Sequence, residues 1–226
     1  MKIRGPTELV DALDQALAWR KHEITNLHLL IKSARRDHEK QLLIRATIPI
    51  LYAHWEGFAK KAGEFYLQLV AMQGLPFNRL QTNFVALGCK NTVREAGHSN
   101  QLQLYINVVE FAAFNQVIQA KFKYDGTIDV EDNLSSRVLA NLLTIVGIPC
   151  DAFFTSRFLL IDGSLLKSRN EIAHGEDTEL DEPTYDQLHS LVIELMDYLK
   201  LALENAAVLK LYLRKFPCLS SAAESQ

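Results

Sequence analysis

Arg169-Asn170-Glu171-Ile172-Ala173-His174-Gly175 closes an apolar run whose spacing predicts a helix with one buried face, near residues 156–174. Gly175 stands where a helix usually ends, because glycine adopts the left-handed backbone conformation at little steric cost. His174 is therefore expected in the last turn. The apolar members of the run are Phe158, Leu159, Ile161, Leu165, Leu166, Ile172 and Ala173.

Arg169 and His174 suit the chemistry of phosphate esters. A histidine can move protons near neutral pH, and an arginine can hold a phosphate and stabilise its charge. Asn170 and His174 are four residues apart and share a face. Arg169 and His174 are five apart, roughly 140° around the helix axis, so both cannot point straight at one small target. The long Arg169 side chain can nevertheless bend toward His174.

The position at a helix end adds an electrostatic constraint. The partial negative charge of a helix C-terminus repels a phosphate and raises the pKa of a histidine, while the positive Arg169 opposes both effects. A phosphate near His174 would therefore depend on Arg169. A structural alternative stays open, in which His174 bonds the last carbonyls and Arg169 forms an exposed salt bridge, since such networks often imitate sites.

Three segments, taken in order, resemble the HEPN superfamily and in particular its MAE-type bacterial members. The first is Arg45-Ala46 followed by Leu51–Phe58, and the second runs from Asn133–Ser136 to Gly147–Pro149. The third is Arg169–Gly175, which is similar to the Arg-polar-x3-His signature of the superfamily. The resemblance implies an all-α fold and an active site where two signature helices meet in a dimer.

The resemblance, which covers roughly residues 40–200, also implies roles for individual residues. Arg169 and His174 from both subunits would be catalytic and line one cleft. Asn170 would fix local hydrogen bonds, and Glu56 would orient Arg169 or His174. For Glu56 an alternative is equally open, because a Glu56–Lys60 pair at i,i+4 on a wet surface follows from the same helical geometry.

The function implied is metal-independent cleavage of RNA, in which a ribose 2′-hydroxyl attacks the adjacent phosphate. No cofactor is expected. The implied partners are RNA, a second copy of the chain, and an antitoxin or other regulatory protein, because members of the superfamily often act as toxins or in phage defence. The alternative is a non-catalytic helical domain that binds a nucleotide or a protein partner.

Composition and charge fit one compact domain in a reducing compartment. The chain has 226 residues, 48% of them hydrophobic, and should bury around 70% of its unfolded surface. The formal net charge of −3 means that any RNA contact must be local. The densest basic cluster comprises Arg35, Arg36, Lys40 and Arg45. It is interpreted either as a solvated helix end, the favoured view, or as an RNA track.

Cysteine and histidine usage predicts neither disulfides nor a metal site. Cys89, Cys150 and Cys218 are odd in number and far apart, which fits the cytoplasm. The seven histidines show no metal-ligand spacing. The N-terminus lacks an apolar signal core, and no apolar run is long enough to cross a membrane.

The apolar periodicity predicts a single helical bundle over residues 1–216, with a disordered tail at 217–226. Two long helices open the chain, at 6–34 and 38–73, and should form an antiparallel hairpin. Pro49 predicts a kink or local break in the second helix. A long last helix begins at Asp181 or Glu182 and is expected to reach Lys215.

The middle of the chain gives weaker signals. A short helix is expected near residues 84–87, with turns marked by Gly88 and Gly97. A helix at 101–120 carries more large apolar residues than one face can hold, which hints at burial by a second subunit. Asn133 is expected to cap a helix that ends near Val146.

Overall fold

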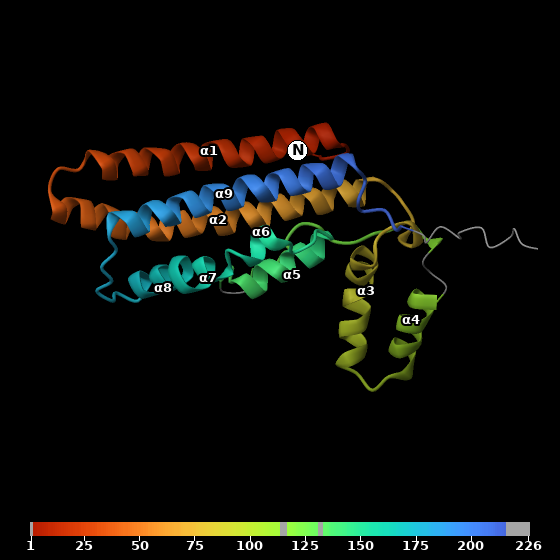
Figure 1. Cartoon of the computed structure of the whole chain (residues 1–226). Helices are drawn as coiled ribbons and strands as arrows, with labels where there is room; N and C mark the ends of the chain where they lie inside the picture. The colour runs from red at the N-terminus through yellow and green to blue at the C-terminus, as the bar shows by residue number, and fades with distance from the viewer. Residues whose placement is uncertain (1, 114–116, 131–132, 216–226) are drawn as a thin grey trace, which may run out of the picture.

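The computed structural model describes residues 2–113, 117–130 and 133–215 of the chain and confirms an all-α bundle. Three long helices, α1 (Pro6–Ser33), α2 (Asp37–Met72) and α9 (Glu182–Val208), lie side by side along the length of the molecule (Figure 1). Within the described ranges the only pairings of extended backbone are two isolated bridges, Pro76 with Gln119 and Leu80 with Leu213.

The predicted hairpin of α1 and α2 is confirmed. Pro6 opens α1, where its missing N–H costs nothing, and the Glu8 carboxylate accepts a hydrogen bond from the Gly5 N–H at 2.6 Å. Pro49, where a kink or a local break is predicted, does not break the helix, because α2 runs through this position as one element. Pro49 removes one backbone bond, and its neighbours Ile48 and Leu51 are fully buried, so packing holds the helix together.

A second layer of shorter helices lies along α2 (Figure 1). It begins with α5 (Ser136–Val146) and α6 (Ala152–Thr155). The single helix predicted near 156–174 is wrong in detail, because it is built from three pieces: α7 (Phe158–Leu160), a π-helical segment (Ile161–Leu166) and α8 (Lys167–Ala173). The π-helical segment and α8 pack against α2.

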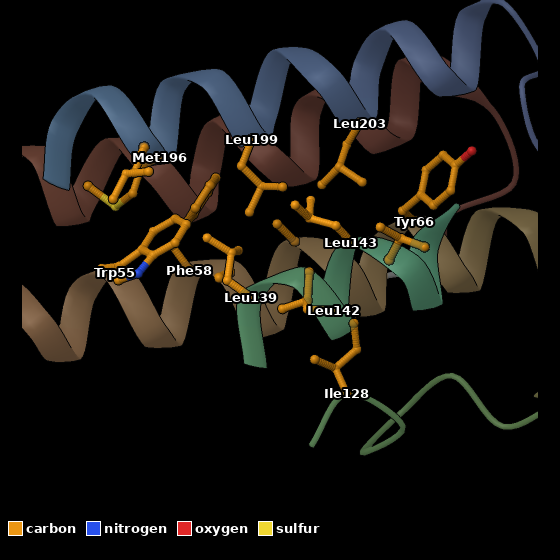
Figure 2. Packing of buried hydrophobic residues seen from close by; sticks show 14 of the residues in the cluster. Trp55, Phe58, Tyr66, Ile128, Leu139, Leu142, Leu143, Met196, Leu199 and Leu203 are labelled. Atoms are coloured by element: carbon orange, nitrogen blue, oxygen red, sulfur yellow. The ribbon is translucent and has the colours of Figure 1, made fainter. Parts of the chain in front are cut away.

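The core lies where α2, α5 and α9 meet (Figure 2). Trp55 and Phe58 of α2 face Met196 and Leu199 of α9, and all four side chains are fully buried. Trp55 is thus a core residue. Leu139, Leu142 and Leu143 of α5 close the core from below, which fixes the second layer against the long helices.

A helical hairpin of α3 (Thr82–Gly97) and α4 (Leu102–Ala113) stands away from the bundle (Figure 1). α3 is longer than the short helix predicted near residues 84–87, because Gly88, which is predicted to mark a turn, lies inside the helix. A Cβ on Gly88 would come within 2.4 Å of the Phe77 ring, so glycine serves close packing at this position. The short 3₁₀ turn η1 (Phe77–Arg79) supplies that ring.

The ends of two predicted helices are also wrong. The helix expected to reach Ala120 ends its described part at Ala113. Residues 118–120 instead pair with residues 75–77, since the Phe77 N–H bonds Ile118 O and the Ala120 N–H bonds Leu75 O. The helix expected to reach Lys215 ends at Val208, after which Lys210 takes a left-handed conformation with φ of 50°.

Two further expectations concern the C-terminal tail and membrane spans. The predicted disordered tail at 217–226 lies outside the described residues and stays a prediction. None of the helices described is both long and apolar enough to cross a membrane.

Gly88→Ala should lower the free energy of unfolding by about 1–3 kcal/mol, the usual cost of forcing extra volume into a packed core. The Cβ must displace the Phe77 ring, which is 2% exposed. Urea unfolding followed by circular dichroism measures the change.

Gly97→Ala is the matched control in the same helix, because nothing lies within 4 Å of its Cβ position. It should leave stability unchanged or raise it by up to about 1 kcal/mol, through the better helix propensity of alanine. Equal effects of the two substitutions would show that Gly88 is not a packing glycine.

Candidate functional site

The Arg169–Gly175 stretch forms the end of α8, as predicted, and Gly175 ends the helix with φ of +80°. The Gly175 N–H bonds Ile172 O at 3.1 Å, and the Glu176 N–H bonds Glu171 O at 2.9 Å. These two bonds define a Schellman motif, which satisfies the last carbonyls through the backbone. The side chain of His174, the C-cap residue, is exposed and is not needed to cap the helix.

Arg169 points inward instead of forming an exposed salt bridge. One guanidinium nitrogen donates to Asn133 Oδ1 at 2.8 Å and to Asn170 Oδ1 at 2.7 Å. The guanidinium carbon also lies 4.9 Å from the centre of the Tyr52 ring, within the range of a cation–π contact. Asn170 therefore fixes a hydrogen bond of Arg169. A guanidinium has five N–H donors, so these contacts leave others for a ligand.

Tyr52 supports this arrangement from α2. It is buried, and its hydroxyl accepts a hydrogen bond from the Leu134 N–H at 2.5 Å. Burial and a hydrogen bond to the Glu56 carboxylate raise the pKa of Tyr52, while the Leu134 N–H and Arg169 act in the opposite direction. The hydroxyl is thus kept neutral and fixes the chain just after Asn133.

Glu56 is placed near Arg169 only indirectly. It contacts Tyr52, whose ring faces the guanidinium, so any orienting effect of Glu56 must pass through Tyr52. The alternative pair with Lys60 is not among the ion pairs of the described residues. One Glu56 carboxylate oxygen is buried without a described hydrogen-bond partner.

The π-helical segment positions α5 beside the site. The wider turn brings Asp162 to the start of α5, where it accepts hydrogen bonds from the Ser136 N–H at 2.7 Å and the Ser136 hydroxyl at 2.5 Å. The N-cap of α5 is Ser135 and not Asn133 as predicted. Asn133 is thereby available to Arg169.

The loop after α8 is fastened by basic residues. Arg45 donates hydrogen bonds to the carbonyls of Glu176 and Thr178, and Glu182 pairs with Lys32 at 2.5 Å and Lys40 at 2.7 Å. These lysines lower the pKa of Glu182 to about 2. Arg45 therefore holds this loop and Lys40 holds the start of α9, which weakens the interpretation of these two residues of the basic cluster as an RNA track.

The structure does not join Arg169 to His174 within one chain. Among the described residues, neither a hydrogen bond nor a ring contact connects the two side chains, in keeping with their predicted angular separation. In the same described ranges no group of three His, Cys, Asp or Glu residues is placed to hold a metal ion.

Sequence reasoning missed Asn133, Tyr52 and Asp162 as parts of this site. Asn133 and Tyr52 lie inside the segments that resemble the superfamily, so that likeness was an available signal. Asp162 carried no signal, because its role depends on a π turn that apolar spacing does not reveal.

These features define a class: an all-α domain in which a half-buried arginine and an exposed histidine lie at the end of one helix, supported by a long neighbouring helix. The family model described as HEPN_MAE_28990-like HEPN matches residues 9–212 of the chain. The chain therefore belongs to this HEPN family. Neither the curated proteins nor the solved structures contain a match.

Tyr52→Phe tests the support beneath Arg169. The substitution keeps the ring but leaves the buried Leu134 N–H without its acceptor, which should lower the free energy of unfolding by about 1–3 kcal/mol. Tyr185→Phe is the matched control, because the Tyr185 hydroxyl is buried with no described partner. Its loss should be neutral or stabilising, and urea unfolding that shows equal losses for both variants would contradict the role given to Tyr52.

Proposed function

We propose that the chain is a metal-independent RNA endonuclease of the HEPN type, with Arg169 and His174 as its catalytic residues. The observation that supports this best is the way in which the Arg169 side chain is held. Its guanidinium is pre-positioned by Asn133, Asn170 and the Tyr52 ring, yet it has no described carboxylate partner. An arginine held in this way can bind a phosphate without first breaking an ion pair.

The proposed reaction is an internal transesterification. The ribose 2′-oxygen attacks the adjacent phosphorus, and the bond from phosphorus to the 5′-oxygen breaks. The 2′-hydroxyl loses a proton to a base and the leaving 5′-oxygen gains one from an acid, which leaves a 2′,3′-cyclic phosphate and a 5′-hydroxyl. His174 serves one of these two proton transfers, and Arg169 stabilises the charge on the phosphoryl oxygens.

A dimer resolves the separation of the two side chains. We infer that His174 of one copy works with Arg169 of a second copy across a shared cleft. The exposure of His174 and the absence of a described contact between the two side chains support this inference. A toxin or phage-defence role, with a regulatory partner that holds the activity, is the biological setting that family membership suggests.

A second candidate function is favoured by α4, which buries no residue. Leu104, Val108 and Phe111 form its inner side, and Phe111 contacts Phe77 with ring centres 5.2 Å apart. An outer stripe of four apolar side chains, each at least 38% exposed, comprises Leu102, Tyr105, Ile106 and Val109. A stripe of this kind fits a domain whose role is to bind another protein.

His174→Ala should lower the rate of RNA cleavage by about 10²–10⁴-fold, the usual contribution of a positioned proton-transfer group. His98→Ala is the matched control, because His98 is also an exposed helix C-cap residue, at the end of α3. It should cut RNA at the parental rate. If His174→Ala cuts as fast as His98→Ala, the domain is not a nuclease of this type.

Arg169→Ala should lower the rate of RNA cleavage by about 10²–10³-fold. Arg169→Lys should also lower this rate substantially, because an ammonium lacks the planar fork that binds two phosphate oxygens. Cleavage of a labelled RNA should continue in EDTA and leave a 2′,3′-cyclic phosphate. Replacing the 2′-hydroxyl at the cut site with a 2′-O-methyl group should prevent it. Activity lost in EDTA and restored by a divalent metal would contradict the mechanism.

Mixing the two inactive variants tests the shared cleft. Neither Arg169→Ala nor His174→Ala retains both groups in one chain, but a mixed dimer brings Arg169 of one copy to His174 of the other. Refolding the variants together should restore roughly a quarter to a half of parental activity, by the statistics of mixed assembly of closed dimers. No recovery, with co-purification of differently tagged copies showing that mixed dimers formed, would place the site within a single chain.

A further inference from the structure

A groove between α1 and α2 has a chemistry that the proposed cleavage site does not use. Its volume is about 710 Å³, within the range of small-ligand sites, and the turn at residues 123–125 forms its rim. Neither Arg169 nor His174 lines it. Its aromatic and amide side chains are Trp19, Phe65, Tyr124, Gln15 and Gln68.

Trp19 is the most unusual residue of the groove, because it is 52% exposed and yet fixed in position. The Arg20 guanidinium lies 4.4 Å from the centre of the indole, and the His54 ring meets it at 70° with centroids 5.2 Å apart. Arg20 is itself held by a hydrogen bond to Ala16 O at 2.6 Å. A large ring held in this way offers a stacking surface at little entropic cost to a ligand.

The other polar groups of the groove suit a flat ligand with both donors and acceptors. Gln15 and Gln68 each carry a carbonyl oxygen and an amino group, so they can match either kind of edge atom. Phe65 and Tyr124 add further apolar ring surface. A planar heteroaromatic ring with a mixed hydrogen-bonding edge is the chemistry of a nucleobase, and bases stack readily on aromatic side chains.

The charges of the groove limit what else the ligand carries. Lys61 and Lys123 are balanced by Glu64 and Asp125, so the lining has no net formal charge. Glu64 is buried, accepts a hydrogen bond from the Gly126 N–H at 2.9 Å, and lies 3.3 Å from Lys61. A polyphosphate would meet as many carboxylates as ammonium groups, whereas one phosphate can be placed next to a lysine.

We propose that this groove binds a nucleobase carrying a single phosphate, supplied either as a free nucleoside monophosphate or as one nucleotide of an RNA strand. The site is independent of the proposed cleavage chemistry, because its lining shares no residue with the signature helix. Binding therefore persists in a protein that cannot cut.

The experiment uses the full chain carrying His174→Ala, so that RNA stays intact. Trp55 is fully buried, so ligand-dependent quenching of tryptophan fluorescence reports on Trp19. One arm titrates the four nucleoside monophosphates, and the other titrates a short single-stranded RNA. Saturable quenching by a monophosphate identifies the free nucleotide as the source, and quenching by RNA alone identifies the strand. No saturable quenching in either arm overturns the proposal.

Variants measured by equilibrium dialysis complete the test. Trp19→Ala should weaken binding by about 5- to 150-fold, the usual loss when a base loses its stacking partner. Tyr105→Ala removes another exposed aromatic, outside the groove on α4, and should bind like the parent. Lys61→Ala should weaken binding of the monophosphate more than binding of the nucleoside, and Lys60→Ala should not. Parental affinity in Trp19→Ala would overturn the proposal.

Discussion

The half-buried charge of Arg169 is the constraint on which the rest of the site depends. A guanidinium partly removed from water must be surrounded by acceptors or by an aromatic face, because an unsatisfied buried charge is costly. That need is met by the side-chain oxygen of Asn133, from the stretch before α5, by that of the neighbouring Asn170 in α8, and by the Tyr52 ring of α2. Chain segments far apart in sequence are thereby tied to one side chain.

Several local departures from regular structure accompany these contacts of Arg169. Ser135 caps α5, and the Asn133 side chain binds Arg169 instead. Asp162, in the π-helical segment, accepts hydrogen bonds from Ser136 in the first turn of α5. A π turn forms poorer backbone bonds than an α turn, and π segments are frequent at functional sites. The irregular geometry thus lies where the candidate chemistry lies.

The long helices were predictable and the junctions between them were not. The stripes of α1, α2 and α9 repeat over many turns, so their periodicity identifies them with little ambiguity. Gly88 was misjudged because glycine serves both turns and close packing, and only the tertiary position of Phe77 decides between them. The role of Asn133 was misjudged for a similar reason, since an asparagine before a helix can cap it or bind a distant partner.

The sequence identifies Arg169 as a candidate site residue, but the contacts of its side chain could not be predicted. The spacing in α8 correctly indicated that Arg169 and His174 diverge, but not that Tyr52 lies under the guanidinium. That contact depends on how α2 and α8 cross. Likewise, Lys40 and Arg45, interpreted chiefly as part of a solvated helix end, bind the start of α9 and the loop after α8.

That loop has a kinetic consequence. Arg45 binds its carbonyl groups, so the carboxylates of Glu176, Asp177 and Glu179 remain exposed within five residues of His174. They create a negative potential that a polyanion must cross before it reaches the histidine. Salt shortens the reach of this potential, from about 30 Å at 0.01 M to about 10 Å at 0.1 M ionic strength. If RNA is the ligand, its encounter with this end of the molecule would be faster at higher salt, the reverse of the behaviour of proteins that attract nucleic acid through a basic surface.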